Sequence, residues 1–143
     1  MGYHRMSDQE RDVFLRDPVR PAVLATRRAD GRPHAAPVWY GLDGDTIVFT
    51  TGADTVKGRN LTRDPRVALC VQDDRPPFSF VSVEGMAVLV DDLDEVQRWA
   101  TRIGGRYMGN ERAAEYGARN GVPGELLVRV RAVHTVSVSD VAD

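Results

Sequence analysis

The clearest capacity for chemistry in this sequence of 143 residues lies in residues 54–64, a short segment rich in positive charge. Read as a helix with Asp54 as its N-cap, the segment places Lys57 and Asn60 three positions apart on one side. Free backbone N–H groups and the positive end of the helix dipole favour an anion at such an N-terminus. We therefore expect a phosphate clamp formed by the polar residues Thr50, Thr51, Lys57, Arg59 and Asn60.

The composition of this segment leaves two interpretations open. Its only large apolar residues, Val56 and Leu61, do not share a helical face, so we expect core packing to contribute little to its position. It also holds Lys57, the only lysine among 19 cationic residues, of which 18 are arginine. Lysine is a compact point charge and arginine a planar fork, so this position favours a specific contact. A solvated connector helix without a ligand is the alternative.

Two other short segments are candidates for lining a ligand site. In residues 34–40, small residues and a proline would let a flat ligand lie against strand backbone. Trp39 and Tyr40 point to opposite faces of that strand, so at most one of them covers a ligand. Residues 78–80 follow a proline-rich turn and either wall a pocket or simply begin a strand. For residues 34–40 an ordinary strand without a ligand is the alternative.

The same sequence argues against several classes of site and partner. Cys70 is the only cysteine, the three histidines lie far apart, and no His or Cys pair has metal-ligand spacing, so we expect neither a disulfide nor a metal site. The formal net charge of -2 argues against a nucleic-acid partner. No apolar stretch approaches the ~20 residues that a membrane helix needs, and no signal-peptide pattern opens the chain. We therefore expect a cytoplasmic protein without a membrane partner.

The elements that must position these residues are mostly short strands. Strands at 19–27, 34–41 and 46–51 are predicted to form a three-stranded meander, because Asp-Gly dipeptides that suit tight turns join them. The other predicted elements are strands at 66–72, 80–90 and 126–139 and helices at 7–17, 54–64, 92–104 and 112–120. Six antiparallel strands with short flanking helices predict a mainly β (α+β) fold, a small closed barrel that residues 1–143 form as one domain.

The order of several short motifs resembles that of a known family. These motifs are Ala25-Thr26, Asp30-Gly31-Arg32-Pro33-His34, Pro37-Val38-Trp39-Tyr40, Lys57-Gly58-Arg59-Asn60-Leu61, Arg63-Asp64-Pro65-Arg66-Val67 and Val83-Glu84-Gly85. The set covers about residues 10–139 and resembles the pyridoxamine 5'-phosphate oxidase-like split β-barrel superfamily. Within it, the sequence is similar to the flavin/deazaflavin oxidoreductases that use coenzyme F420.

The resemblance implies a homodimer of six-stranded split β-barrels with two cofactor sites at the subunit interface. The clamp residues named above would contact the cofactor phosphate. The ring would lie against Pro33, His34, Ala36, Pro37 and Val38. The second subunit would supply Phe78 and Ser79. The candidates for a substrate pocket are Trp39, Tyr40, Tyr107 and Met108, and the resemblance implies the last two of them.

The sequence departs from the pyridoxamine phosphate oxidases themselves. Their C-terminal Arg-Leu-His-Asp-Arg motif is absent from the run between Arg129 and His134, so oxidation of vitamin B6 phosphates is not expected. The Lys-x-Arg-Asn motif and the arginine-rich composition favour coenzyme F420 over FMN. The expected reaction is hydride transfer from the reduced deazaflavin to an electron-poor double bond of a small organic substrate. Tyr40, Tyr107 or water would supply the accompanying proton.

Two alternatives keep the same fold. FMN presents a phosphate and a similar ring, so an FMN-dependent oxidoreductase is the first. Because the sequence shows no indispensable acid or base, a non-catalytic protein that binds a deazaflavin or flavin is the second. The substrate itself is not predicted, because one scaffold serves many reactions.

Overall fold

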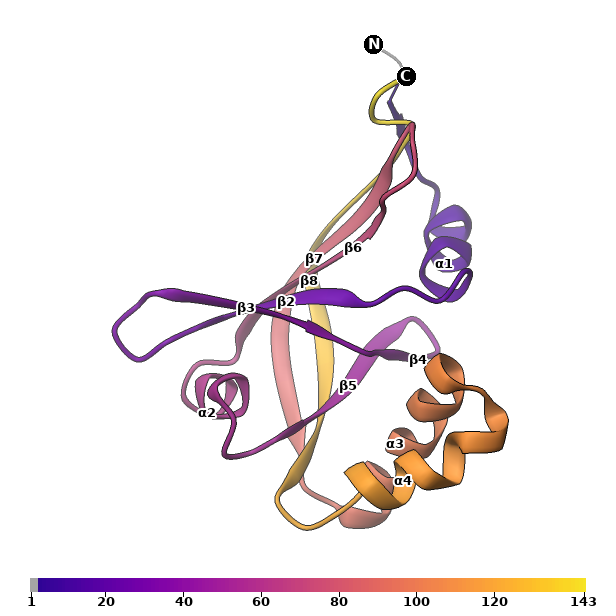
Figure 1. Ribbon diagram of the computed structural model, residues 1–143. Coiled ribbons are helices and arrows are strands. Elements are labelled where there is room, and N and C mark those ends of the chain that lie inside the picture. Colours follow the sequence, from indigo (N-terminus) through magenta and orange to yellow (C-terminus); the bar gives the residue numbers. More distant parts are fainter. Residues whose placement is uncertain (1–2) are drawn as a thin grey trace.

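An antiparallel sheet of eight strands dominates the computed structural model, which describes residues 3–143 (Figure 1). Its strands are β1 (His4–Arg5), β2 (Ala22–Arg27), β3 (Pro33–Val38), β4 (Gly41–Asp43), β5 (Thr46–Gly52), β6 (Arg66–Asp73), β7 (Ser79–Val90) and β8 (Glu125–Ser139). The helices are α1 (Asp8–Arg16), α2 (Val56–Arg63), α3 (Leu93–Met108), α4 (Ala113–Asn120) and a 3-10 turn, Asn110–Arg112. No helix in this part of the chain is long and apolar enough to cross a membrane.

The strands pair in the order β3-β2-β6-β7-β8-β5-β4, and β1 pairs with β8. β3 and β4, the two ends of this path, follow each other directly in the chain, yet within residues 3–143 no backbone pairing joins them. The sheet nevertheless curls around a common core, because side chains from β2, β5, β7 and β8 meet in one buried cluster. The mainly antiparallel β fold with short helices is therefore confirmed, whereas the closed six-stranded barrel is not.

The predicted three-stranded meander is wrong at its second strand. Pro33–Val38 pairs with β2, but the chain leaves this strand at Trp39, and Gly41–Asp43 pairs with β5. β5 in turn pairs with β8 rather than with β3. The break coincides with Tyr40, whose side chain is buried and whose backbone N–H donates to the hydroxyl of Tyr107 (3.1 Å) instead of to a neighbouring strand.

Tyr40 also anchors α1 to the rest of the molecule. Its side chain is fully buried, and its hydroxyl donates to the carbonyl of Leu15 (2.8 Å) in the last turn of α1. The guanidinium of Arg106 donates to the same carbonyl (2.6 Å) and lies over the Tyr40 ring. Burial raises the pKa of Tyr40 to about 12, although the charge of Arg106 opposes the shift. Two donors from distant segments thus satisfy a carbonyl at the C-terminus of α1.

A direct backbone contact holds α2 against the sheet. A Cβ atom on Gly58 would lie 2.0 Å from the carbonyl oxygen of Gly52, so only glycine permits this approach. The helix is capped by Thr55, not by Asp54 as predicted, because the Thr55 hydroxyl accepts a hydrogen bond from the Gly58 N–H (3.1 Å). Leu61 is buried in the main core, so the prediction that core packing contributes little to this helix is wrong.

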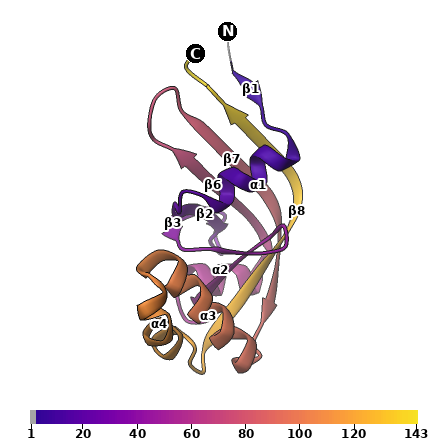
Figure 2. The same ribbon diagram turned by 90° about the vertical axis from the view of Figure 1, so that its right-hand side faces the viewer.

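α3 covers the face of β5 and β8 that points away from the main core. Its Val96, Trp99 and Ile103 pack with Val48 and Leu127 in a second buried cluster. α4 lies alongside α3, and both views show the two helices together at one end of the sheet (Figure 2). The α3–α4 hairpin therefore sits on the sheet through α3.

Replacing Tyr40 with phenylalanine tests the link between Tyr40 and α1. Tyr40→Phe keeps the ring packing and removes one hydrogen bond, so the free energy of unfolding at neutral pH should fall by about 1 kcal/mol. Between pH 10 and 12 the unfolded state loses the Tyr40 proton while the folded state retains it, because the folded pKa is about 12. Urea unfolding should therefore show the wild type losing stability over this range more steeply than the variant. Parallel losses would contradict the raised pKa.

Alanine at position 58 should destabilise the protein although alanine is the better helix former. In an open helix, replacing glycine with alanine gains up to ~1 kcal/mol. Here the added Cβ forces α2 away from Gly52, and overpacking of this kind costs ~1–3 kcal/mol. We expect Gly58→Ala to lower the free energy of unfolding in urea by about 2 kcal/mol. The control Arg59→Ala, at an exposed position of α2, should change it by less than about 0.5 kcal/mol; equal losses would refute the contact.

Candidate functional site

Four elements far apart in the chain meet around a cavity of about 270 Å³ beside α2, here called the Lys57 cavity. The end of β3, the middle of β5, α2 and the α3–α4 hairpin each supply part of its wall. Its lining residues are Pro37, Val38, Trp39, Thr50, Lys57, Ala100, Ile103, Gly104 and Asn120. The structure thus brings together five residues expected at the site: Pro37, Val38, Trp39, Thr50 and Lys57.

Arg59 lies on the opposite flank of α2 from Lys57, because positions two apart in an α-helix point about 200° apart. There it lines a second cavity of about 310 Å³, here called the arginine cavity. The lining residues of that cavity are Arg28, Ala29, Asp30, Arg32, Val56, Arg59, Asn60 and Arg63. The residues that the sequence predicts to form one phosphate clamp are therefore divided by α2, with Lys57 at one cavity and Arg59 at the other.

Two other residues of the expected clamp already have partners within the protein. Asn60 is 4% exposed, its Nδ2 donates to Thr26 Oγ1 (3.0 Å), and its Oδ1 accepts from Arg63 Nη2 (2.9 Å). Thr51 is also buried, and its hydroxyl is hydrogen-bonded to the hydroxyl of Thr55 (3.1 Å). Asn60 and Thr51 thus hold α2 on β2 and β5, and neither lines the Lys57 cavity.

Lys57 is the only charged residue among those that line the Lys57 cavity. Two carboxylates lie close behind it, on Asp54 and on Glu125, which pairs with Gly52 in the β5–β8 ladder. Partial burial raises the pKa of Glu125, the charge of Asp54 raises it further, and the charge of Lys57 opposes both. Within the cavity itself, an anion meets a single positive point charge.

Trp39 forms an aromatic wall of the Lys57 cavity. Its indole is 37% exposed and stacks on the ring of Tyr107, with centroids 5.0 Å apart and an interplanar angle of 4°. The Tyr107 hydroxyl donates to the carbonyl of Arg20 (2.8 Å) and accepts from the backbone N–H of Tyr40 (3.1 Å). Tyr107 therefore fixes the plane of Trp39 from behind instead of lining the cavity.

The structure overturns the expectation that Tyr40 lines a substrate pocket. Its side chain has no exposed surface. Burial also raises the pKa of Tyr107, and the hydroxyl protons of Tyr40 and Tyr107 are both given to backbone carbonyls. Such phenols do not release a proton readily, which contradicts their expected role as proton donors. Met108 is exposed at the end of α3 and is not among the lining residues of the cavity.

The other residues expected to contact a ring lie along β3. His34 and Ala36 are half-buried, whereas Pro33 and Pro37 are exposed. The Nδ1 atom of His34 is buried without a hydrogen-bond partner in residues 3–143. β3 begins just after the turn that lines the arginine cavity and ends at the Lys57 cavity, so its backbone connects the two.

Phe78 and Ser79 lie far from α2 within the same chain. The turn between β6 and β7 that carries Phe78 is at the opposite end of the sheet, beside both chain termini (Figures 1 and 2). Phe78 is 42% exposed and has a φ of 67°, which is rare for a bulky residue. The backbone N–H groups of Val141 and Ala142 donate to the carbonyls of Phe78 and Pro77 and hold this turn in place.

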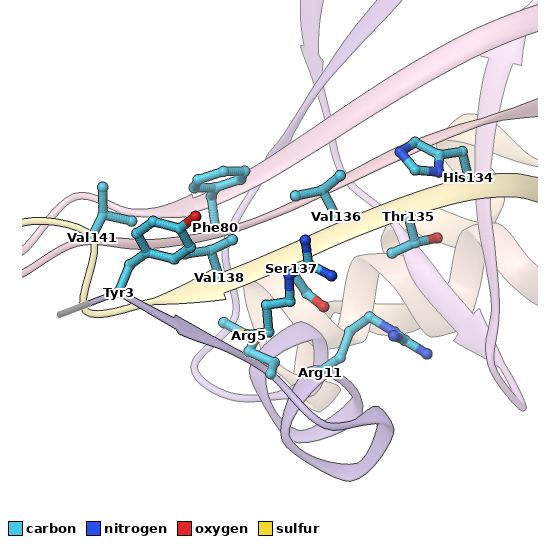
Figure 3. A pocket seen from close by; sticks show the side chains of 11 residues that line it. Tyr3, Arg5, Arg11, Phe80, His134, Thr135, Val136, Ser137, Val138 and Val141 are labelled. Atoms are coloured by element: carbon cyan, nitrogen blue, oxygen red, sulfur yellow. The ribbon is translucent and has the colours of Figure 1, made fainter. Parts of the chain in front are cut away.

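A groove of about 570 Å³, which the sequence did not suggest, lies at the same end of the sheet (Figure 3). It is lined by Tyr3, Arg5, Met6, Arg11, Phe80, His134, Thr135, Val136, Ser137, Val138 and Val141. Alternation along the predicted strand 126–139 places Val136 on the same face as Val128 and Val130, which are buried. A β-bulge inserts Val133 between the partners of Glu84 and Gly85, and Val136 is exposed.

The chain is similar in sequence to two named enzymes. It is 35% identical over 105 residues to a pyridoxine/pyridoxamine 5'-phosphate oxidase of Cupriavidus metallidurans, which covers 68% of this chain and 48% of that protein. It is 31% identical over 100 residues to a dihydrophenazinedicarboxylate synthase of Pseudomonas chlororaphis, which covers 69% of this chain and 44% of that protein. The chain thus spans about half the length of these two relatives.

Two solved structures share the fold over most of the chain. Conserved hypothetical protein Rv2991 from Mycobacterium tuberculosis matches with a TM-score of 0.81 and 31% identity, over 92% of this chain and 84% of that chain. A structure named F420 reductase matches with a TM-score of 0.68 and 25% identity, over 87% of this chain and 94% of that chain. The family model described as pyridoxamine 5'-phosphate oxidase matches residues 7–137. The chain therefore belongs to the pyridoxamine 5'-phosphate oxidase-like family.

Proposed function

We propose that this chain is an oxidoreductase that binds a phosphate-bearing cofactor of the flavin type, with coenzyme F420 preferred over FMN. It transfers hydride from the reduced ring to an electron-poor double bond of a small organic molecule. The observation that carries the proposal is the Lys57 cavity, where the single lysine and Thr50 meet the backbone at the end of β3. Family membership and the similarity to a protein named F420 reductase support it.

The Lys57 cavity fits a phosphate group together with the edge of a ring. Lys57 is the second residue of α2, so its ammonium lies near the positive end of the helix dipole. The hydroxyl of Thr50 adds a second donor, and a compact ammonium accommodates a phosphate in several orientations. The ring would then extend along β3, where small residues leave the strand backbone accessible.

The chemistry divides between the ligand and the chain. When bound, the reduced deazaflavin supplies the hydride. The chain binds the phosphate through Lys57, orients the ring along β3 and excludes water with Trp39, Ala100 and Ile103. The lining residues of the cavity include no carboxylic acid and no phenol, so we assign the accompanying proton to water.

Two alternatives use the same geometry. FMN offers a phosphate and a similar ring, and it would occupy the site in the same way. A non-catalytic cofactor-binding protein is favoured by the lack of an acid–base group other than Lys57 among the lining residues. Turnover with reduced F420 or reduced FMN against enones, quinones and tetrapyrroles distinguishes them, because a binding protein leaves each bound cofactor reduced.

We also propose that a second copy of the chain completes the site. The Lys57 cavity, at about 270 Å³, is smaller than the ~300–1,000 Å³ typical of ligand pockets. Phe78 and the groove beside it present apolar surface at the other end of the same sheet. A twofold homodimer would bring Phe78 and Ser79 of one copy to the α2 region of the other.

Removing the charge of Lys57 should weaken cofactor binding through the phosphate alone. We expect Lys57→Ala to raise the Kd for F420 and for FMN by about tenfold or more. The Kd for riboflavin, which has the FMN ring without the phosphate, should stay within about twofold because no phosphate contact is lost. Fluorescence titration of the purified protein measures all three values.

Arg98→Ala is the matched control, because Arg98 is exposed on α3 and does not line the cavity. This variant should keep the wild-type Kd for every ligand. The phosphate assignment is wrong if the wild type binds neither F420 nor FMN, or if Lys57→Ala leaves the tighter of the two unaffected.

Mixing two defective variants tests whether the site is shared between subunits. Lys57→Ala and Phe78→Ala each damage both sites of a homodimer, whereas a mixed dimer keeps one site in which both residues are intact. After subunit exchange between equal amounts, about a quarter of the sites should bind FMN with wild-type affinity, because about half of the dimers are mixed. No recovery in a sample that native mass spectrometry shows to contain mixed dimers would refute the role of Phe78.

A further inference from the structure

We propose that Asn120 recognises the planar ring in the Lys57 cavity by donating a hydrogen bond from its side-chain amide to a ring carbonyl. The inference rests on the proposed function only in requiring that a ring enters this cavity. Asn120 is the last residue of α4 and lines the cavity together with Trp39, Thr50 and Lys57. The sequence alone gives Asn120 no role other than as the last residue of the predicted helix 112–120, before Gly121.

The position of Asn120 is fixed because α4 packs on α3 through glycines on either side of it. A Cβ on Gly117 would lie 2.0 Å from the Thr101 hydroxyl oxygen, and a Cβ on Gly121 would lie 2.7 Å from the Gln97 Cα. These approaches hold the end of α4 in one register against α3, and α3 is packed on the sheet through its own buried face. A polar group on a rigid support meets a ligand with little loss of conformational entropy.

The amide of Asn120 is available to a ligand. A carboxamide carries two N–H donors and one acceptor. Asn120 is half-buried at the cavity wall, and its side chain forms no hydrogen bond with another residue among 3–143. Thr50 and Lys57, the other polar side chains of the wall, lie on β5 and α2. The cavity therefore has polar groups supplied by three separate elements.

A carbonyl-bearing ring matches these surroundings. Lys57 supplies the positive charge that an anionic group requires, so the neutral Asn120 amide suits a neutral acceptor. Trp39 offers the face of an aromatic ring, and Ala100 and Ile103 add apolar wall. The carbonyl has two chemical sources, the pyrimidine edge of the cofactor ring or a quinone-type substrate, and the experiment separates them.

The test compares Asn120→Ala and Asn120→Asp with Asn110→Ala, which makes the same change in the 3-10 turn of the same hairpin but outside the cavity. FMN, riboflavin and menadione are titrated into each purified protein, and Kd is obtained from ¹H–¹⁵N spectra that include the asparagine side-chain amides. Alanine is a better helix former than asparagine, so Asn120→Ala should fold. Loss of one hydrogen bond should weaken binding by about three- to tenfold.

Each result decides the proposal. Equal weakening of FMN and riboflavin in both Asn120 variants places the cofactor ring against Asn120, because the phosphate contact is untouched. Weakening of menadione alone places a substrate carbonyl there. The proposal fails if all three Kd values are unchanged, if Asn110→Ala shows the same losses, or if no probe binds the wild type. If Asn120→Ala weakens riboflavin binding while Lys57→Ala leaves the Kd values of FMN and F420 unchanged, the role of Asn120 stands and the phosphate assignment of Lys57 is refuted.

Discussion

The contact between α2 and the end of β5 determines where the polar groups of the site lie. The backbones approach so closely at Gly58 that a Cβ atom there would lie 2.0 Å from the Gly52 carbonyl oxygen. The Thr55 cap and the buried Asn60 amide act on the same short helix, so its rotation is set as well as its position. A helix of eight residues has little stability of its own, and these tertiary contacts orient Lys57 toward one cavity.

That fixed rotation makes α2 a divider between two positively charged cavities. One cavity contains Lys57 as its single charge, and the other contains four arginines with one aspartate. The backbone of β3 runs from one to the other, so a ligand that lies along this strand is exposed to positive potential at both ends. Tyr40 and Tyr107 serve the framework, because their hydroxyls donate to backbone carbonyls. These residues can therefore bind and orient a ligand, and under the proposed function the redox chemistry comes from that ligand.

Structural features that depend only on residues close together in the sequence were predictable. Ser7 with Glu10 three residues later predicts a capping box, which the structure contains, and the Asp-Gly turns place Gly31 and Gly44 at positive φ. Gly85 within the predicted strand 80–90 indicates a bulge, and β7 and β8 shift register there; the alternation of Val81, Val83 and Ala87 correctly indicates the buried face of β7. These features were predictable because caps, tight turns and strand faces are decided within a few residues. The ordered motifs, beyond these local rules, correctly indicated the family.

The sequence by itself thus determined most of the individual elements, the family and the single lysine on a short polar helix, whereas the tertiary structure decided how these parts meet. β5 pairs with β8 instead of β3, Tyr40 is buried in the core, and Asn60 turns inward to Thr26. Asn120 reaches the Lys57 cavity only because glycines let α4 pack closely on α3. Each of these outcomes joins residues distant in the chain, and their packing and hydrogen bonds depend on complementary shapes that no local pattern contains.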